Sequence, residues 1–389
     1  MRLRWLWVPL FLCGLCSSPA KADNRVIVRT TLGLQGLQAF CSGLPLLQTC
    51  TVVGGLDGSL GQLFLVTTPV DLPTFLNLLG STVGIVDAEA DQLLNLVSGL
   101  NQVTTPPAGL SDTTPVNYSG STVWDGYVNQ PAANIVRVSA AQTTFHVTGT
   151  GIVADIDTGV DPNHPALKPV LLPGYDFTRN QPGGSEMTDF TGTPPSGSTT
   201  NIANVNQSTA AVLDQSMAAV LDTSQYAAFG HGTMVMGIIH LVAPQAQLLP
   251  LKAFRSDGTG YLSNILHAVY YGVQSGTNVI NMSFDMKSNL PEFSKAMDYA
   301  NQSGVICAAS AGNDGMQEIV YPAAYQNDVM GVASTSDTDT RSSFSNYGDA
   351  IVWVAAPGEG IISAYPFSNY AAGWRPSVRH LFPARALYC

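Results

Sequence analysis

Near-continuous apolar segments alternate with helical segments over most of the chain from Gly149 onward. Strands that are buried on both faces have such apolar runs, and strands separated by helices pair in parallel. The sequence therefore predicts an α/β domain whose parallel sheet is covered by helices on both faces. The alternating segments are Gly151–Ile156, Thr233–Leu241, Gln247–Ala253, Ser263–Gln274, Asn278–Phe284, Phe293–Gln302, Val305–Ala309 and Val329–Ala333.

Size and charge limit the functions that this chain can have. Its 389 residues are 45% apolar, which is enough to bury a large core and leaves room for two domains. The formal net charge is −11 with only 16 lysines and arginines, so the chain has no extended positive surface for a phosphate backbone. We therefore expect no nucleic-acid partner.

The N-terminus has the pattern of a secretory signal. Arg2 and Arg4 precede an apolar run over Trp5–Leu15, and Ala20-Lys21-Ala22 has the small residues of a cleavage site. The run is about half as long as the roughly 20 residues that span a bilayer, which makes a retained membrane anchor the minor alternative. The sequence predicts a signal peptide over residues 1–22, a secreted, extracellular protein and no stable membrane insertion.

Short strand-like and helical patterns fill residues 23–100 and predict a small α+β domain. Residues 101–126 are rich in Thr, Pro, Ser and Gly, so we expect an exposed linker there. Residues 180–228 have a similar composition and interrupt the strand and helix alternation. We interpret them as a surface insertion that is either functional or poorly ordered.

Four cysteines remain after the predicted signal, at Cys41, Cys50, Cys307 and Cys389, and their spacing matches no zinc or redox motif. An oxidising destination allows a bridge between Cys41 and Cys50, and two unpaired thiols are an equal alternative. Cys307 lies in an apolar strand and is expected in the core.

Three segments hold polar residues suited to acyl transfer. They are Val153–Gly159, which contains Asp157, then Gly230–Thr233, which contains His231, then Ala309–Gly315, which contains Asn313. In this order they resemble the acid, base and oxyanion segments of the subtilisin-like serine peptidases. The resemblance extends over about Gly149–Tyr370 through the residues that follow each motif.

The resemblance implies a subtilisin-like three-layer α/β domain over residues 127–374, preceded by an inhibitory prosegment over residues 23–100. It implies that Asp157 orients His231, that His231 acts as general base and that Asn313 stabilises the oxyanion. The protein would then be a serine endopeptidase made as a zymogen, with its own prosegment and a peptide or protein substrate as partners.

The segment Ile280–Asp285 resembles the family's strand that pairs with an extended substrate, which makes Ser283 and Phe284 candidate substrate-binding residues. Asp155 stands two residues before Asp157, where the family usually has an apolar residue, and alternate strand residues share a face. We leave open whether Asp155 is solvated, paired or structural. No acidic cluster marks a metal site, so we expect no cofactor, although structural calcium remains possible in this family.

The resemblance ends at the position where the family's sequence pattern contains the nucleophilic serine. The family pattern requires Gly-Thr-Ser soon after Tyr365, but the chain continues with the Arg-rich residues 375–389, which we interpret as an aberrant tail. We expect a truncation or frameshift and a copy that is inactive as written, because Ser377 lacks the glycine context of the motif. The alternative is a non-catalytic protein, either a peptide-binding pseudoenzyme or a prosegment-type inhibitor.

Overall fold

The computed structural model describes residues 23–44, 49–96, 105–192, 203–205, 210–212, 218 and 221–373. The predicted signal peptide and the predicted aberrant tail lie outside the described residues, as do Ser377 and Cys389.

The first unit is a four-stranded antiparallel sheet covered by two helices. Its strand order is β2-β3-β1-β4. The strands are β1 (Asn24–Thr30), β2 (Thr51–Gly55), β3 (Leu63–Thr68) and β4 (Ile85–Ala90), the helices are α1 (Gly33–Gly43) and α2 (Leu72–Gly80), and η1 is a short turn of helix (Gly58–Leu60). Cys41 and Cys50 form a disulfide, which was one of the two alternatives that the sequence left open.

Side chains along β1 point alternately to the two faces of the sheet, and each face packs against a different part of the protein. Val26 and Val28 face α1 and α2, and they share one buried cluster with Leu37 and Phe75. Ile27 points to the other face and belongs to the core cluster of the larger unit. The sheet therefore has one face for its own helices and one for its neighbour.

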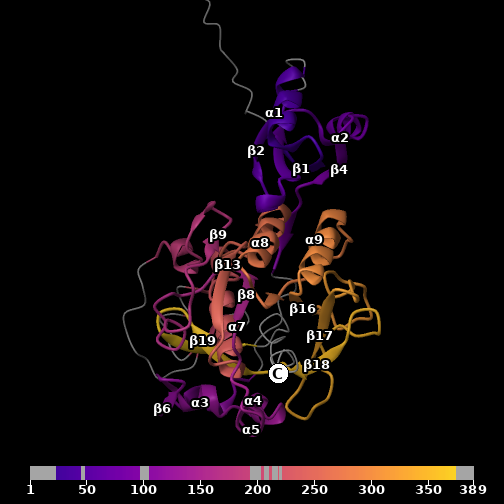
Figure 1. Cartoon of the computed structure of the whole chain (residues 1–389). Helices are drawn as coiled ribbons and strands as arrows, with labels where there is room; N and C mark the ends of the chain where they lie inside the picture. Colours follow the sequence, from indigo (N-terminus) through magenta and orange to yellow (C-terminus); the bar gives the residue numbers. More distant parts are fainter. Residues whose placement is uncertain are drawn as a thin grey trace, which may run out of the picture.

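The small unit rests on two helices of the larger one, α8 (Leu262–Gln274) and α9 (Pro291–Gln302) (Figure 1). Arg29 donates to Glu292 at 2.6 Å and to the Tyr270 hydroxyl at 3.1 Å. Arg25 forms an ion pair with Asp91 at 2.7 Å. The two Arg29 contacts join residues that are more than 200 positions apart in sequence, whereas the Arg25–Asp91 pair joins two residues of the first unit.

After β4 the chain adds one more strand to the larger unit. Strand β5 (Leu93–Asn95) pairs antiparallel with β14 (Thr259–Tyr261), and the backbone N–H of Leu96 donates to Gly258 O at 2.8 Å. Leu96 is buried in the same cluster as Phe254 and Leu262.

The larger unit contains an eight-stranded sheet with the order β10-β9-β13-β8-β15-β16-β17-β18. The six strands from β13 to β18 in this order pair in parallel. They are β13 (Gln247–Lys252), β8 (Ile152–Asp157), β15 (Val279–Met282), β16 (Ile306–Ser310), β17 (Val329–Thr335) and β18 (Val354–Pro357). Two short strands follow beyond β13: β9 (Tyr175–Asp176) also pairs in parallel with β13, and β10 (Gln181–Pro182) pairs antiparallel with β9 at the edge.

Helices cover both faces of this sheet, which confirms the predicted fold class. On one face α7 (His231–Val242) shares a buried cluster with Val153 of β8. On the other face α8 and α9 share a cluster with Ala154 and Ile156. Val153, Asp155 and Asp157 have the same parity along β8, so the two aspartates face the α7 layer.

Residues 105–126 correct one sequence expectation. We predicted an exposed linker, but the segment forms η2 (Ala108–Ser111) and a hairpin of β6 (Pro115–Tyr118) and β7 (Ser121–Trp124). Leu110 and Val123 are 0% and 1% exposed in the α7-side core. A few well-spaced apolar side chains anchor a segment whose average composition is that of a linker. Three short helices follow, α3 (Asp125–Val128), α4 (Pro131–Ile135) and α5 (Val138–Phe145).

Described parts of the predicted insertion over residues 180–228 also join the core, so this segment is not purely a surface loop. They include η3 (Glu186–Asp189), β11 (Ala203–Val205), β12 (Ala210–Val212) and η4 (Ser224–Tyr226). Strand β12 pairs with β20 (Asn369–Gly373), which pairs in turn with β19 (Ile361–Tyr365). Val212 and Leu221 are fully buried.

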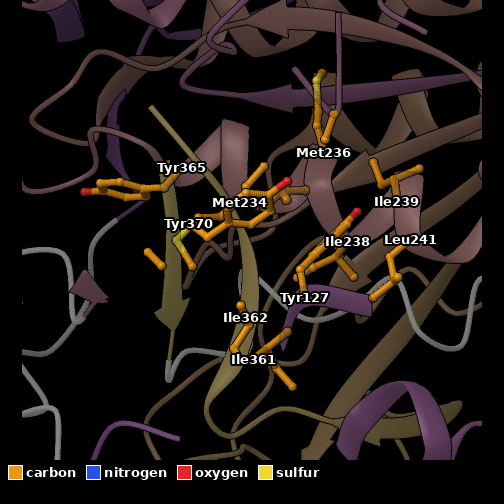
Figure 2. Close-up of a cluster of buried hydrophobic side chains, with 14 of the residues drawn as sticks. Tyr127, Met234, Met236, Ile238, Ile239, Leu241, Ile361, Ile362, Tyr365 and Tyr370 are labelled. Carbon is orange, nitrogen blue, oxygen red and sulfur yellow. The ribbon is translucent and has the colours of Figure 1, made fainter. Parts of the chain in front are cut away.

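Strands β19 and β20 pack against α7. Met234, Ile361 and Tyr370 belong to one buried cluster in this layer (Figure 2). The Tyr127 hydroxyl donates to Gly237 O at 2.6 Å and ties α3 to the same helix. Met234 and Met236 of α7 are buried in this core.

Candidate active site

Asp157 and His231 meet where a strand ends and a helix begins. Asp157 is the last residue of β8 and His231 is the first residue of α7. The imidazole Nδ1 lies 2.7 Å from Asp157 Oδ1 and 2.8 Å from Oδ2. Asp157 is fully buried, and its Oδ1 also accepts a hydrogen bond from the Thr158 backbone N–H at 2.6 Å.

The other imidazole nitrogen of His231 has no partner among the described residues. With Nδ1 directed at the carboxylate, Nε2 is the nitrogen left to exchange a proton with a third group. A carboxylate that fixes one nitrogen and leaves the other open is the arrangement of a general base.

Asn313 lies beyond the end of β16, two strands from β8 in the sheet. Its turn is fixed by Asn346, whose Oδ1 accepts from the backbone N–H groups of Asp314 at 2.9 Å and Met316 at 3.1 Å. The strands are parallel, so Asp157 and Asn313 lie at the same carboxyl edge of the sheet, where α/β proteins bind their ligands.

Ser283 and Phe284 follow β15, the strand between β8 and β16. Ser283 is fully buried and its Oγ accepts from Asn281 Nδ2 at 2.8 Å. The Phe284 ring packs against Phe254 and Phe293 in the core, so only its backbone is available to an extended peptide. Burial raises the pKa of the neighbouring Asp285 to about 6, although Lys287 opposes the shift.

Asp155 is paired rather than solvated. It is 1% exposed, and Asn281 Nδ2 donates to its Oδ1 at 2.8 Å, while its Oδ2 has no partner among the described residues. Burial, and secondly the charge of Asp157, raises the pKa of Asp155 well above its ordinary value. The protonated form avoids two neighbouring buried charges on one strand.

Glu186 is a buried acid that the sequence analysis missed. Its Oε2 accepts from the Thr158 hydroxyl at 3.0 Å and from the Gly230 N–H at 2.8 Å, and the Thr233 hydroxyl donates to its Oε1. Burial raises the pKa of Glu186 to about 8, although these hydrogen bonds act in the opposite direction. No motif marks Glu186, because it lies within the Gly-, Ser- and Thr-rich insertion.

Lys252, at the end of β13, is a second buried group to which the sequence analysis assigned no role. Its ammonium donates to the carbonyl oxygens of Thr158 and Phe254 and to Asp189 Oδ2, each at 2.8 Å. The lysine is fully buried and all three of its protons have acceptors. It therefore holds the residue after Asp157 in place from the β13 side.

No group of three or more His, Cys, Asp or Glu side chains in the described part of the chain could hold a metal ion. None of the described helices has the length and apolar character needed to cross a bilayer.

Comparisons with known proteins give one consistent family. The family model described as "Subtilase family" matches residues 149–379. Thermitase from Thermoactinomyces vulgaris is 32% identical over 259 residues, which are 64% of this chain and 77% of thermitase. A thermophilic serine proteinase from Bacillus sp. (strain AK1) is 32% identical over 56% of this chain and 46% of its own length. A crystal structure of a cold adapted subtilisin-like serine proteinase aligns with a TM-score of 0.48 and 27% identity, covering 62% of this chain and 76% of that one.

Proposed function

The chain belongs to the subtilase family, whose members are subtilisin-like serine peptidases, and we propose that it is the precursor of a secreted endopeptidase. In this proposal Asp157 orients the imidazole, His231 is the general base and Asn313 donates to the oxyanion. The observation that carries the proposal is the 2.7 Å contact between His231 Nδ1 and Asp157.

The proposed chemistry follows from the two imidazole nitrogens. Asp157 keeps the proton on Nδ1, so Nε2 accepts the proton of a serine hydroxyl as that oxygen attacks the scissile carbonyl carbon. The carbonyl oxygen becomes negative and receives a hydrogen bond from Asn313. Nε2 then gives its proton to the leaving amine, and a water molecule repeats the cycle on the acyl-enzyme. Loss of an oxyanion donor of this kind costs about 2.7–4 kcal/mol of transition-state stabilisation in the subtilisin example.

The nucleophile is the element that this sequence does not supply. Residues 374–389 contain no Gly-Thr-Ser, and the last residues are unlike the family pattern. We propose that residues 1–389 hold the acid, the base and the oxyanion donor, and that they do not form an acyl-enzyme. A non-catalytic peptide-binding or inhibitory role is the second candidate, and the Arg-rich residues 375–389, which depart from the family pattern, favour it.

The contacts of the first unit support its role as a prosegment. Its sheet covers α8 and α9, and β5 occupies the free edge of β14, as a peptide bound by strand addition would. The loop before β14 is joined to the acid, because the Phe254 N–H donates to Asp157 O at 3.2 Å. A peptide or protein substrate would then compete with β5 for β14.

The export proposal rests on residues 1–22 alone, with their arginines, apolar run and small residues. An exported form whose N-terminus is Asp23 is the expected product. N-terminal sequencing of protein recovered from the medium tests this, and a mature protein that retains residues 1–22 would contradict it.

Labelling with a fluorophosphonate tests the catalytic proposal, because only an activated serine reacts. We expect no labelling of the unaltered chain. We expect labelling and casein hydrolysis when the codons after Gly373 are changed to encode the family's Gly-Thr-Ser segment, and loss of both in a His231→Ala variant of that enzyme. Strong labelling of the unaltered chain at Ser377 would overturn the assignment of the nucleophile, and a restored enzyme that never labels would favour the non-catalytic role.

A further inference from the structure

Glu186 contacts both segments that flank the acid and the base. Thr158, whose hydroxyl donates to Glu186, directly follows Asp157. Gly230, whose N–H donates to the same Oε2, directly precedes His231. The Thr233 hydroxyl donates to the other oxygen from the first turn of α7. One carboxyl group therefore receives hydrogen bonds from the end of β8 and from the start of α7.

These two segments also bond to each other around Glu186. The Gly232 N–H donates to Thr158 Oγ1 at 3.0 Å, and the Asp161 N–H donates to Thr233 Oγ1 at 2.8 Å. Each threonine oxygen thus accepts a bond from the opposite segment, while its hydroxyl proton is directed to Glu186. Without an acceptor at Glu186, neither hydroxyl would keep a fixed orientation.

The backbone holds Glu186 against the acid segment. The Glu186 N–H donates to Val160 O at 3.1 Å, and the Val160 N–H donates to Gly184 O at 2.9 Å. A Cβ on Gly159 would lie 2.6 Å from Gly184 O and 2.8 Å from Glu186 N, so the two segments are in backbone contact. This close packing leaves the carboxyl group little freedom to move away.

Thr158 is held from the other side by a cation. Lys252 donates to the Thr158 carbonyl oxygen at 2.8 Å, while Glu186 accepts from the Thr158 hydroxyl at 3.0 Å. Both side chains are buried, so water does not compete for these bonds. The residue beside Asp157 is thereby fixed at two different atoms.

We propose that Glu186 is a positioning residue, which fixes the spacing and orientation of Asp157 and His231 by bridging Thr158, Gly230 and Thr233. This role rests on the proposed function, because positioning Asp157 and His231 matters only if the two residues act as a catalytic pair. Glu186 does not touch the substrate in this scheme. It acts through the two segments that carry the catalytic side chains.

The test is proton NMR of the unaltered precursor, which observes the His231 Nδ1–H held by Asp157 as a low-field resonance. A Glu186→Met variant has a similar side-chain volume but no acceptor, and we expect it to fold and to lose this resonance. Glu186→Gln keeps an oxygen for Thr158 and Gly230 and turns an NH2 group toward Thr233 Oγ1. We expect Glu186→Gln to retain the resonance, whereas a general loss of packing would affect both variants.

A second pair of variants decides the question if Glu186→Met does not fold. Thr158→Val removes the hydroxyl that bonds to Glu186, and Thr158→Ser keeps it. We expect the resonance to be lost in the first and kept in the second. Thr335→Val is the matched control, because the Thr335 hydroxyl is also buried but has no partner among the described residues.

The outcomes separate this proposal from the proposed function. A folded Glu186→Met variant with an unchanged resonance would overturn the role of Glu186, as would Thr158→Val and Thr158→Ser both retaining it. Asp157→Asn must abolish the resonance. If it does not, the pairing of Asp157 with His231 is wrong, and the role of Glu186 fails with it.

Discussion

The interior of this protein contains three buried acidic side chains at or close to the proposed acid and base. Asp155, Asp157 and Glu186 are each at most 1% exposed, and they lie around the end of β8. Each of these carboxyl groups has different hydrogen-bond partners in place of water. Asp157 is hydrogen-bonded to the imidazole of His231, and Asp155 accepts a hydrogen bond from the amide of Asn281. Glu186 accepts hydrogen bonds from two hydroxyl groups and a backbone N–H. A buried carboxyl group is tolerated only when such partners replace water.

Glu186 should make the stability of the protein depend on pH. Folding raises its pKa from about 4.5 to about 8, so the folded state favours the protonated acid. This contribution is fully present below pH 4.5 and is lost as the pH rises through 8. We expect the difference in free energy of unfolding between the natural chain and Glu186→Gln to fall steadily from pH 5 to pH 8, measured by urea denaturation. A difference that does not change with pH would show that folding does not shift this group.

Gly232 should be intolerant of any side chain. A Cβ at this position would lie 2.0 Å from Gly159 O, at the contact between the acid and base segments. We expect Gly232→Ala to lower the free energy of unfolding by about 1–3 kcal/mol, in the range of overpacked cores. Gly80→Ala is the control, because nothing lies within 4 Å of a Cβ at Gly80. Equal thermal unfolding midpoints for the two variants would contradict the predicted collision between a Cβ at position 232 and Gly159 O.

At the scale of elements, helix ends and strand ends bring the important groups together. The carboxyl ends of β8, β15 and β16 place Asp157, Ser283 and Asn313 along one edge, and α7 begins at His231 beside it. The first unit uses helix starts too, since Asp91 accepts from the Ser263 N–H at 2.8 Å in the first turn of α8. Carboxylates are favourable at the positive ends of helices.

The pair between β1 and α9 should be a strong contact. Arg29 bonds to Glu292, whose side chain is fully buried, so removing the guanidinium leaves a buried carboxylate with only Lys295 as its remaining ion-pair partner. We expect Arg29→Ala to cost about 3 kcal/mol of stability, measured by denaturant unfolding. Lys287→Ala breaks pairs that are largely exposed and should cost at most about 1 kcal/mol. Similar losses in both variants would refute the distinction.

The whole molecule consists of a small sheet unit seated on two helices of a large parallel-sheet unit (Figure 1). Charged groups concentrate at their contact. Glu89 of β4 accepts from the Glu292 N–H at 3.3 Å, and Lys295 bonds to both Asp87 and Glu292. Lys295 therefore pairs with two acidic side chains, Glu292 also pairs with Arg29, and Glu89 bonds to a backbone N–H.

This contact should weaken as the pH rises. Burial, and to a lesser degree the charges of Glu292 and Asp87, raises the pKa of Glu89 from 4.5 to about 7, so the docked state favours protonated Glu89. The stabilisation is present below pH 4.5 and is lost through pH 7. We expect the thermal unfolding midpoint of the natural chain, relative to Glu89→Gln, to decrease between pH 5 and pH 7.5. A relative midpoint that increases over this range would show the opposite linkage.

The sequence predicted the fold class and the positions of Asp157, His231 and Asn313 in the elements, because apolar periodicity and short motifs are local signals. It did not predict that residues 105–126 and parts of the insertion join the core. In those segments a few anchors such as Leu110, Val123 and Leu221 are hidden among polar residues, and their partners lie far along the chain. The average composition of these segments therefore does not predict such contacts.

The sequence by itself determined which residues we propose as acid, base and oxyanion donor, since Asp157, His231 and Asn313 appear in this order with their flanking glycines. Only the tertiary structure decided that Nδ1 of His231 lies against Asp157 and that Glu186 and Lys252 hold the neighbouring Thr158. Each of these hydrogen bonds requires a distance near 3 Å, and each joins two residues that are tens of positions apart in the chain. That distance is set by how β8, β13, α7 and the insertion pack together, which no local pattern encodes.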